Sequence, residues 1–217
     1  MNKQKMTTKE LTTLAMLTAI AYALVATIRI PIVLFLKYEP KDVVITIGGF
    51  LMGPMAALIS SSVVALIEMF TISDTGIIGC IMNFLSTCSF AVTAAIVYKR
   101  NHTMPGAILG LAVGTMTMVC TMLLWNYLIT PLYMTGTSRS DIAGMLMPVF
   151  LPFNLLKAGL NSACILLLYK PVVNGLRKAG LLPASPAKGG SRIGITAFAG
   201  LLLVTCILFV LVLRGII

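Results

Sequence analysis

Long apolar runs separated by short polar segments make up most of the chain. They predict membrane-crossing helices at residues 8–30, 76–98, 105–130, 146–169 and 193–213. Each run holds about 20 residues or more, and a helix of that length crosses the ~30 Å hydrocarbon core of a bilayer. The pattern therefore predicts an all-α integral membrane protein.

Residues 43–70 form a further apolar stretch, interrupted at Gly48-Gly49 and at Gly53-Pro54. As one helix the stretch would be ~42 Å long, which is more than a membrane needs. As two helices it has a short helix that ends before Gly53 and a second that begins with Pro54 at a first helical position. The short helix cannot cross a membrane alone and needs neighbouring protein to cover its ends.

The basic residues decide between these two interpretations, because such residues collect at the cytoplasmic ends of spans. The 217 residues carry 16 Lys and Arg against 6 Asp and Glu. With two helices in 43–70 and a cytoplasmic N-terminus, ten basic residues and Glu10 lie inside, while five basic and five acidic residues lie outside. If 43–70 were one helix, the basic residues at 99–100 and those between 170 and 192 would lie outside. The acidic residues assigned to the exterior are Glu39, Asp42, Glu68, Asp74 and Asp141.

This topology divides the chain into three parts. Residues 1–178 form a six-helix membrane domain that binds the substrate, residues 179–192 form a cytoplasmic linker with several Pro and Gly, and residues 193–217 carry an additional transmembrane helix. The seventh helix has almost no polar residues, so its simplest role is an added anchor. A mean hydropathy of +1.02 points to a multi-pass protein of the cell membrane, surrounded by lipid, and excludes a soluble nucleic-acid-binding protein.

Lys157 is the most informative polar residue, because an ionisable group within a span is costly and often marks a functional site. Asn154, Lys157 and Asn161 are spaced i, i+3 and i+7, which places them on one helical face. The asparagines could bond across helices, and the lysine could extend to an interface. For the lysine we favour ligand binding, because its charge needs a specific partner within the membrane.

Two further segments have a mixed polar and apolar character. Asn126 lies between Trp125 and Tyr127, which suits either the aromatic belt at a membrane interface or a planar ligand that forms hydrogen bonds. The first outer connector, residues 34–42, contains Lys37, Tyr38 and Asp42. It suits either a plain interface loop or a lid over a pocket that opens outward.

Small residues recur every four positions on two helices: Ala15, Ala19 and Ala23 near the N-terminus, and Gly106, Gly110 and Gly114 in the run at 105–130. Such rows allow close contact between helices. Internal packing is the simpler interpretation of both. A docking face for another membrane subunit is the alternative, and the alanine row suits it better because it belongs to a terminal helix.

Several kinds of catalytic site have no counterpart in the sequence. It contains no G-x-x-x-x-G-K-[ST] phosphate loop, the five cysteines form no C-x-x-C pair, and His102 is the only histidine. We therefore expect no ATP hydrolysis by this chain, no metal site and no cofactor. No two carboxylates fall within the predicted spans, which argues against both a membrane enzyme and a proton-coupled carrier.

Four segments stand in a specific order and spacing along the chain. They are Leu36–Asp42 leading into Gly48–Pro54, Gly76–Phe90 with Asn83-Phe84, Asn126-Tyr127 with Thr130–Tyr133, and Pro152–Lys157. In this order and spacing they resemble the riboflavin-specific substrate-binding (S) components of energy-coupling factor (ECF) transporters. The resemblance covers roughly residues 6–178.

The resemblance implies six helices with both ends cytoplasmic and riboflavin held near the outer face as the transported ligand. Carried over to this chain, Asn126, Asn154 and Lys157 would bond the flavin, and Lys37, Tyr38 and Asp42 would belong to the lid. The alanine row would dock on a transmembrane coupling subunit that connects to two ATPase subunits, and the S component would topple in the membrane to release the vitamin. The seventh helix departs from this pattern. Flavin mononucleotide, another small vitamin and an autonomous secondary carrier remain as alternatives.

Overall fold

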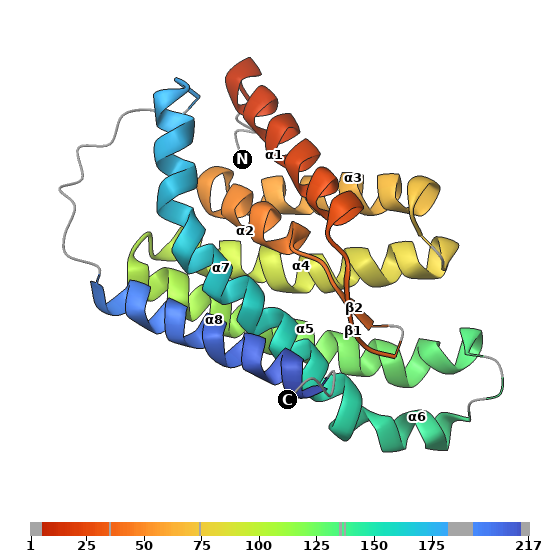
Figure 1. The fold of residues 1–217 in the computed structure, drawn as a ribbon. Coiled ribbons are helices and arrows are strands. Elements are labelled where there is room, and N and C mark those ends of the chain that lie inside the picture. Colours follow the sequence, from red (N-terminus) through yellow and green to blue (C-terminus); the bar gives the residue numbers. More distant parts are fainter. Residues whose placement is uncertain are drawn as a thin grey trace.

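The computed structural model describes residues 6–34, 36–73, 75–134, 136, 138–181 and 193–213. The chain is a bundle of helices with one short hairpin (Figure 1), and the all-α class with a C-terminal seventh helix is confirmed. The elements in chain order are α1 (Thr8–Thr27), β1 (Ile30–Val33), β2 (Leu36–Tyr38), α2 (Lys41–Met52), α3 (Pro54–Thr71), α4 (Gly76–Arg100), α5 (Met104–Tyr133), α6 (Arg139–Met145), the π-helical turn η1 (Leu146–Phe150), α7 (Leu151–Lys178) and α8 (Ile193–Leu213).

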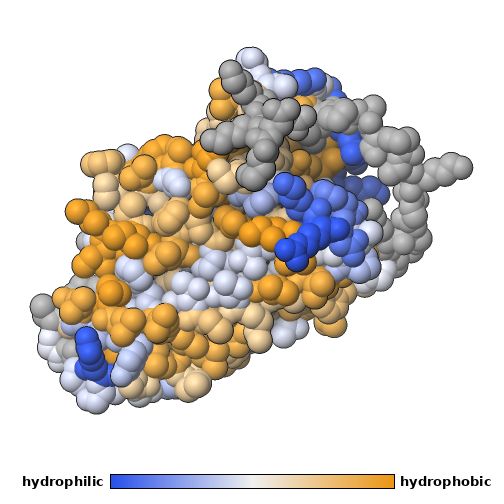
Figure 2. Space-filling view, turned by 180° about the vertical axis from the view of Figure 1, so that it is seen from behind, coloured by the Kyte–Doolittle hydropathy of each residue, from blue (hydrophilic) through white to orange (hydrophobic). Residues whose placement is uncertain are grey.

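Within the described residues, six helical segments are long and apolar enough to cross a membrane: α1, α3, α4, α5, the continuous α6–α7 segment and α8. Helix α2 has 12 residues and is only ~18 Å long. Strongly hydrophilic residues gather toward the ends of the molecule, and hydrophobic surface covers most of the area between them (Figure 2). That distribution fits a protein whose middle is surrounded by lipid.

The predicted break at Gly53-Pro54 is confirmed. Gly53 has φ 94°, a left-handed conformation that glycine adopts without a steric penalty, and Pro54 opens α3. The short helix α2 is enclosed by protein, as its length demands. A Cβ atom at Gly49 would lie 2.9 Å from the Cβ of Ala57 in α3 and 3.1 Å from that of Ala95 in α4.

The glycine row packs internally. A Cβ atom at Gly110 would lie 2.7 Å from the carbonyl oxygen of Ala94, and one at Gly114 would lie 2.6 Å from that of Phe90. Helices α4 and α5 therefore approach each other so closely that only glycine fits at these positions.

Strands β1 and β2 form an antiparallel hairpin, which overlaps the start of the connector predicted at 34–42. Ile30 pairs with Tyr38 and Val33 with Leu36, and the register shifts between Pro31 and Val33. Ile32, Leu36 and Tyr38 point inward and pack with Phe150 of η1 and with Phe153 at the N-terminal end of α7. The hairpin thus has an apolar side that faces the helices.

The predicted helix at 146–169 is longer at both ends and begins with α6. The π-helical turn Leu146–Phe150 contains Pro148, and Pro152 follows it. Proline cannot donate a backbone hydrogen bond, so a local change of helical pitch at this point is expected. Residues 182–192 of the predicted linker and residues 214–217 lie outside the described residues.

Candidate functional site

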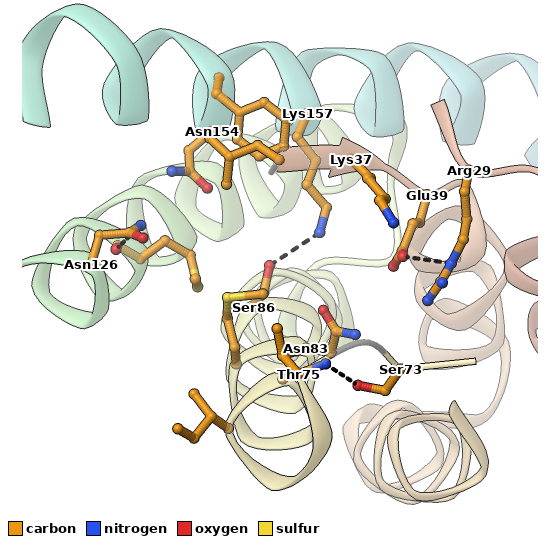
Figure 3. A pocket seen from close by; sticks show the side chains of 16 residues that line it. Arg29, Lys37, Glu39, Ser73, Thr75, Asn83, Ser86, Asn126, Asn154 and Lys157 are labelled. Carbon is orange, nitrogen blue, oxygen red and sulfur yellow. Dashed lines mark hydrogen bonds and ion pairs between the residues drawn. The ribbon is translucent and has the colours of Figure 1, made fainter. Parts of the chain in front are cut away.

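A cavity of about 200 Å³ lies between the hairpin, α4, α5 and α7 (Figure 3). Apolar side chains line part of its wall: Leu36, Ile78, Met82, Met122 and Phe153. Polar side chains line the rest. Asn126 and Asn154 lie toward one side, Arg29 and Glu39 lie toward the other, and Lys157 projects between them (Figure 3).

Three carboxamides in the wall are each held by a hydrogen bond. The Nδ2 atoms of Asn126 and Asn154 donate to the carbonyl oxygens of Met122 and Phe150 one turn earlier, each over 2.7 Å. Asn83 donates to Glu68 Oε2 over 2.7 Å. These bonds fix the orientation of the amides, so the wall presents hydrogen-bonding groups in set directions.

Lys157 has a partner within the protein. Its Nζ atom lies 3.3 Å from Asp42 Oδ2 and 3.3 Å from Ser86 Oγ. Asp42 is 0% exposed and accepts further hydrogen bonds from Thr87 Oγ1 over 2.7 Å and from Asn161 Nδ2 over 3.2 Å. The expected stripe of Asn154, Lys157 and Asn161 therefore faces the interior, and its lysine forms a buried ion pair.

A second buried cluster joins the hairpin to α2 and α3. Lys41 Nζ lies 2.6 Å from both carboxylate oxygens of Glu68 and 2.9 Å from Glu39 Oε2. Arg29 Nε lies 3.2 Å from Glu39 Oε1, and an Arg29 Nη atom donates to the carbonyl oxygen of Ile72 over 2.8 Å. Each carboxylate of the cluster thus lies next to a cation, which offsets part of the cost of burial.

These clusters show where three of the acidic residues assigned to the exterior lie. Glu39, Asp42 and Glu68 are all buried within the protein, and Glu68 lies in a membrane-crossing helix. Asp42 in α2 and Glu68 in α3 thus both lie within the helical body, although no two carboxylates were expected within the spans. The reason is that α2 lies inside the bundle and not at its surface, so Lys41 and Asp42 in its first turn are buried as well.

Of the three lid residues expected in 34–42, only Lys37 lines the cavity. Tyr38 is buried behind the wall, where its hydroxyl contacts the thiol of Cys164 in α7. Burial is the main cause that raises the pKa of the Tyr38 phenol above its usual value, and the neighbouring Cys164 adds to this effect. Asp42 belongs to α2 and reaches the cavity only through Lys157.

The comparisons with known proteins point to one family. The family model described as "ECF transporter, substrate-specific component" matches residues 9–169. The chain belongs to this family of S components. It is 32% identical over 179 residues to the riboflavin transporter RibU of Staphylococcus aureus (strain TCH60), covering 78% of this chain and 93% of the relative.

A solved structure is similar as well. It is described as the S component of a bacterial ECF transporter, with a TM-score of 0.63 and 31% identity, and the match covers 78% of this chain and 98% of that one. The match to the family model ends at residue 169, so α8 lies outside it.

The alanine row of this S component lies on the surface. Ala15, Ala19 and Ala23 are exposed, while the opposite side of α1 packs against α2 and α3. The glycine and alanine rows thus differ: the first holds two helices of the bundle together, and the second is open to a neighbour.

Sequence reasoning missed Arg29, Glu39, Asn83 and Ser86 as residues of the cavity wall. Asn83 and Ser86 are spaced i, i+3 within an apolar helix, the same signal that pointed to Asn154 and Lys157. No comparable signal marks Arg29 and Glu39, because the hairpin brings them together.

Proposed function

We propose that this S component binds riboflavin in the cavity between the hairpin, α4, α5 and α7. The wall that combines three oriented carboxamides, two lysines and apolar side chains supports this proposal most strongly. A flavin has a flat ring with apolar faces and an edge of donors and acceptors. Such a ligand needs an apolar slot with a few fixed polar groups.

The hairpin is proposed as the lid of the site. The cavity of about 200 Å³ is smaller than the roughly 300–1,000 Å³ typical of pockets for drug-sized ligands. A flavin therefore requires part of the wall to move. The hairpin forms one wall from two short strands, whereas the other walls are long helices packed on one another.

The charges around the cavity favour a neutral flavin over flavin mononucleotide. Asp42 pairs with Lys157, Glu39 pairs with Arg29, and Lys37, the third cation of the wall, also has an interaction partner within the protein. A phosphate group binds best to cations that are not already neutralised. We expect riboflavin to bind more tightly than flavin mononucleotide.

Quenching of riboflavin fluorescence by the purified protein tests this proposal. Asn154→Ala and Lys157→Ala should each weaken riboflavin binding by about 1–3 kcal/mol, or about 5- to 150-fold, through lost hydrogen bonds. Asn174→Ala and Lys170→Ala are matched controls, because both residues are exposed on the same helix. A wild-type protein that leaves riboflavin fluorescence unchanged at micromolar concentration contradicts the function. Full affinity in both site variants contradicts the site alone.

We further propose that the alanine row of α1 docks on a transmembrane coupling subunit that works with two ATPase subunits. The exposed row at four-residue spacing supports this, since it offers a smooth surface for close helix contact. Ala19→Trp should abolish co-purification with such subunits and leave riboflavin binding intact. Ala112→Trp, at an exposed position of α5, is the control that should retain the subunits. Co-purification that survives Ala19→Trp contradicts the assignment of this face.

The N-terminus is proposed to lie in the cytoplasm, and the hairpin at the outer face. Two basic residues, Lys9 and Arg177, and one acidic residue, Glu10, line a hollow at the end of the molecule that holds the start of α1 and the end of α7. Basic residues at one end favour the cytoplasmic side. In intact cells, an impermeant thiol reagent should label Leu34→Cys and spare Arg177→Cys, and the reverse result contradicts this orientation.

A further inference from the structure

Helix α8 packs along α7, and its C-terminal end lies near the N-terminal part of α7 (Figure 1). Most of α8 is exposed, but Ala199 and Cys206 are buried. The two helices approach closely at Gly159, where an added Cβ atom would lie 2.9 Å from Cys206 Sγ. The absence of a side chain at Gly159 therefore leaves the space that Cys206 Sγ occupies.

The same helix also contacts the hairpin. Cys206 belongs to one apolar cluster with Ile32, Leu36 and Tyr38 of the hairpin and with Phe153 of α7. Helix α8 lies against strand β1, and the Cys206 thiol is close enough to the Tyr38 phenol to affect it electrostatically. Leu36 and Phe153 line the cavity on their other side.

We propose that α8 is a positioning element of the ligand site, which holds the hairpin over the cavity by completing the apolar cluster beneath it. A two-stranded hairpin is only marginally stable by itself, so its position depends on the packing of its apolar side. Helices α6 and α7 and the turn η1 supply part of that packing, and α8 adds Cys206 with Leu202, Leu203 and Val210. The helix outside the family match thus slows the opening of the lid and the release of ligand, beyond any role as an anchor.

The effect on lid opening can be measured without any ligand. Lys37 is exposed in strand β2, and trypsin cleaves a strand only when it opens locally. Gly159→Leu should displace α8 and raise the rate of cleavage after Lys37, followed by mass spectrometry, at least five-fold. Gly175→Leu makes the same change in the same helix, where an added Cβ atom meets nothing within 4 Å, and should leave the rate within two-fold of wild type.

A second pair of variants approaches the contact from α8 itself. Cys206→Phe introduces bulk into the buried contact, and Val204→Phe introduces it on the exposed side of the same helix. Cys206→Phe should also raise the cleavage rate at least five-fold, and Val204→Phe should not. If Gly159→Leu fails to fold, the comparison of Cys206→Phe with Val204→Phe decides whether α8 holds the hairpin. Unchanged cleavage in the folded contact variants overturns the proposal.

The consequence for the ligand rests on the proposed function and is measured separately. The dissociation rate of riboflavin should rise at least five-fold in Gly159→Leu and in Cys206→Phe, and should be unchanged in the two controls. If wild type binds no riboflavin, the proposed function fails while the cleavage rates still test the role of α8. If wild type binds riboflavin but neither rate changes in the contact variants, the role of α8 is refuted and the proposed function stands.

Discussion

Replacing Asp42 by asparagine tests whether the buried ion pair with Lys157 stabilises the protein. Asparagine has nearly the same shape and can still accept the hydrogen bond from Thr87 Oγ1, which spans 2.7 Å in the native protein. The substitution therefore removes the negative charge, together with the acceptor Oδ2 that takes a hydrogen bond from Asn161 Nδ2 over 3.2 Å. Lys157, whose Nζ atom lies 3.3 Å from Asp42 Oδ2, is left with neutral partners.

The size of the effect follows from the burial of both groups. Removing one partner of a buried ion pair costs about 3–5 kcal/mol, because the remaining charge is uncompensated. Lys157 is 6% exposed and lines the cavity, where water can reach its ammonium group, so we expect the lower end of that range. A cost of about 3 kcal/mol corresponds to a fall in Tm of about 6–12 °C for a protein of this size.

Thermal unfolding of the detergent-solubilised protein measures this cost, and a double variant isolates the pair. Asp42→Asn combined with Lys157→Met removes both charges, so it should be more stable than Asp42→Asn alone by about 2 kcal/mol or more. Lys170→Met is the control for loss of an exposed lysine from the same helix and should change Tm little. Strictly additive losses in the double variant would refute the view that the two charges stabilise each other.

The remaining predictions concern the second ion cluster, the helix contacts and the hairpin. Lys41→Met leaves Glu39 and Glu68 without their shared cation and should lower the free energy of unfolding by about 3–5 kcal/mol. Arg29→Met should lower it less, because the Arg29 side chain is partly exposed. A smaller fall in Tm for Lys41→Met than for Arg29→Met contradicts this prediction. Gly110→Leu should destabilise the α4–α5 contact by about 1–3 kcal/mol or more, as measured by Tm, while Gly144→Leu, in open space, should not. Tyr38→Phe removes the hydroxyl that contacts Cys164 and should cost about 1 kcal/mol, with faster tryptic cleavage after Lys37, and unchanged cleavage would show that this contact does not hold the hairpin.

The helices were predictable because their signal is local. Twenty apolar residues in a row allow almost no other structure in a membrane, and Gly53-Pro54 gives a break that any neighbouring fold must respect. The ends were harder to predict, since packing rather than hydropathy extends α7 to Lys178 past Pro171. The hairpin gave no clear signal because strands of four and three residues are too short for an alternating pattern to stand out.

The pairing of the charges was the part that local reasoning could not reach. Lys157 was predicted to need a partner, because a charge within the membrane is costly. If that partner belongs to the protein, it must be a carboxylate on another segment. The six acidic residues of the chain leave few choices. Only the path of α2 through the bundle selects Asp42, and the same helical turn directs its neighbour Lys41 toward Glu68 in α3. Two adjacent residues thus enter two different ion clusters, one beside the proposed ligand and one at the base of the hairpin. The net charge of a sequence segment therefore says which side of a membrane it prefers, whereas the role of each charge depends on which helix face it occupies.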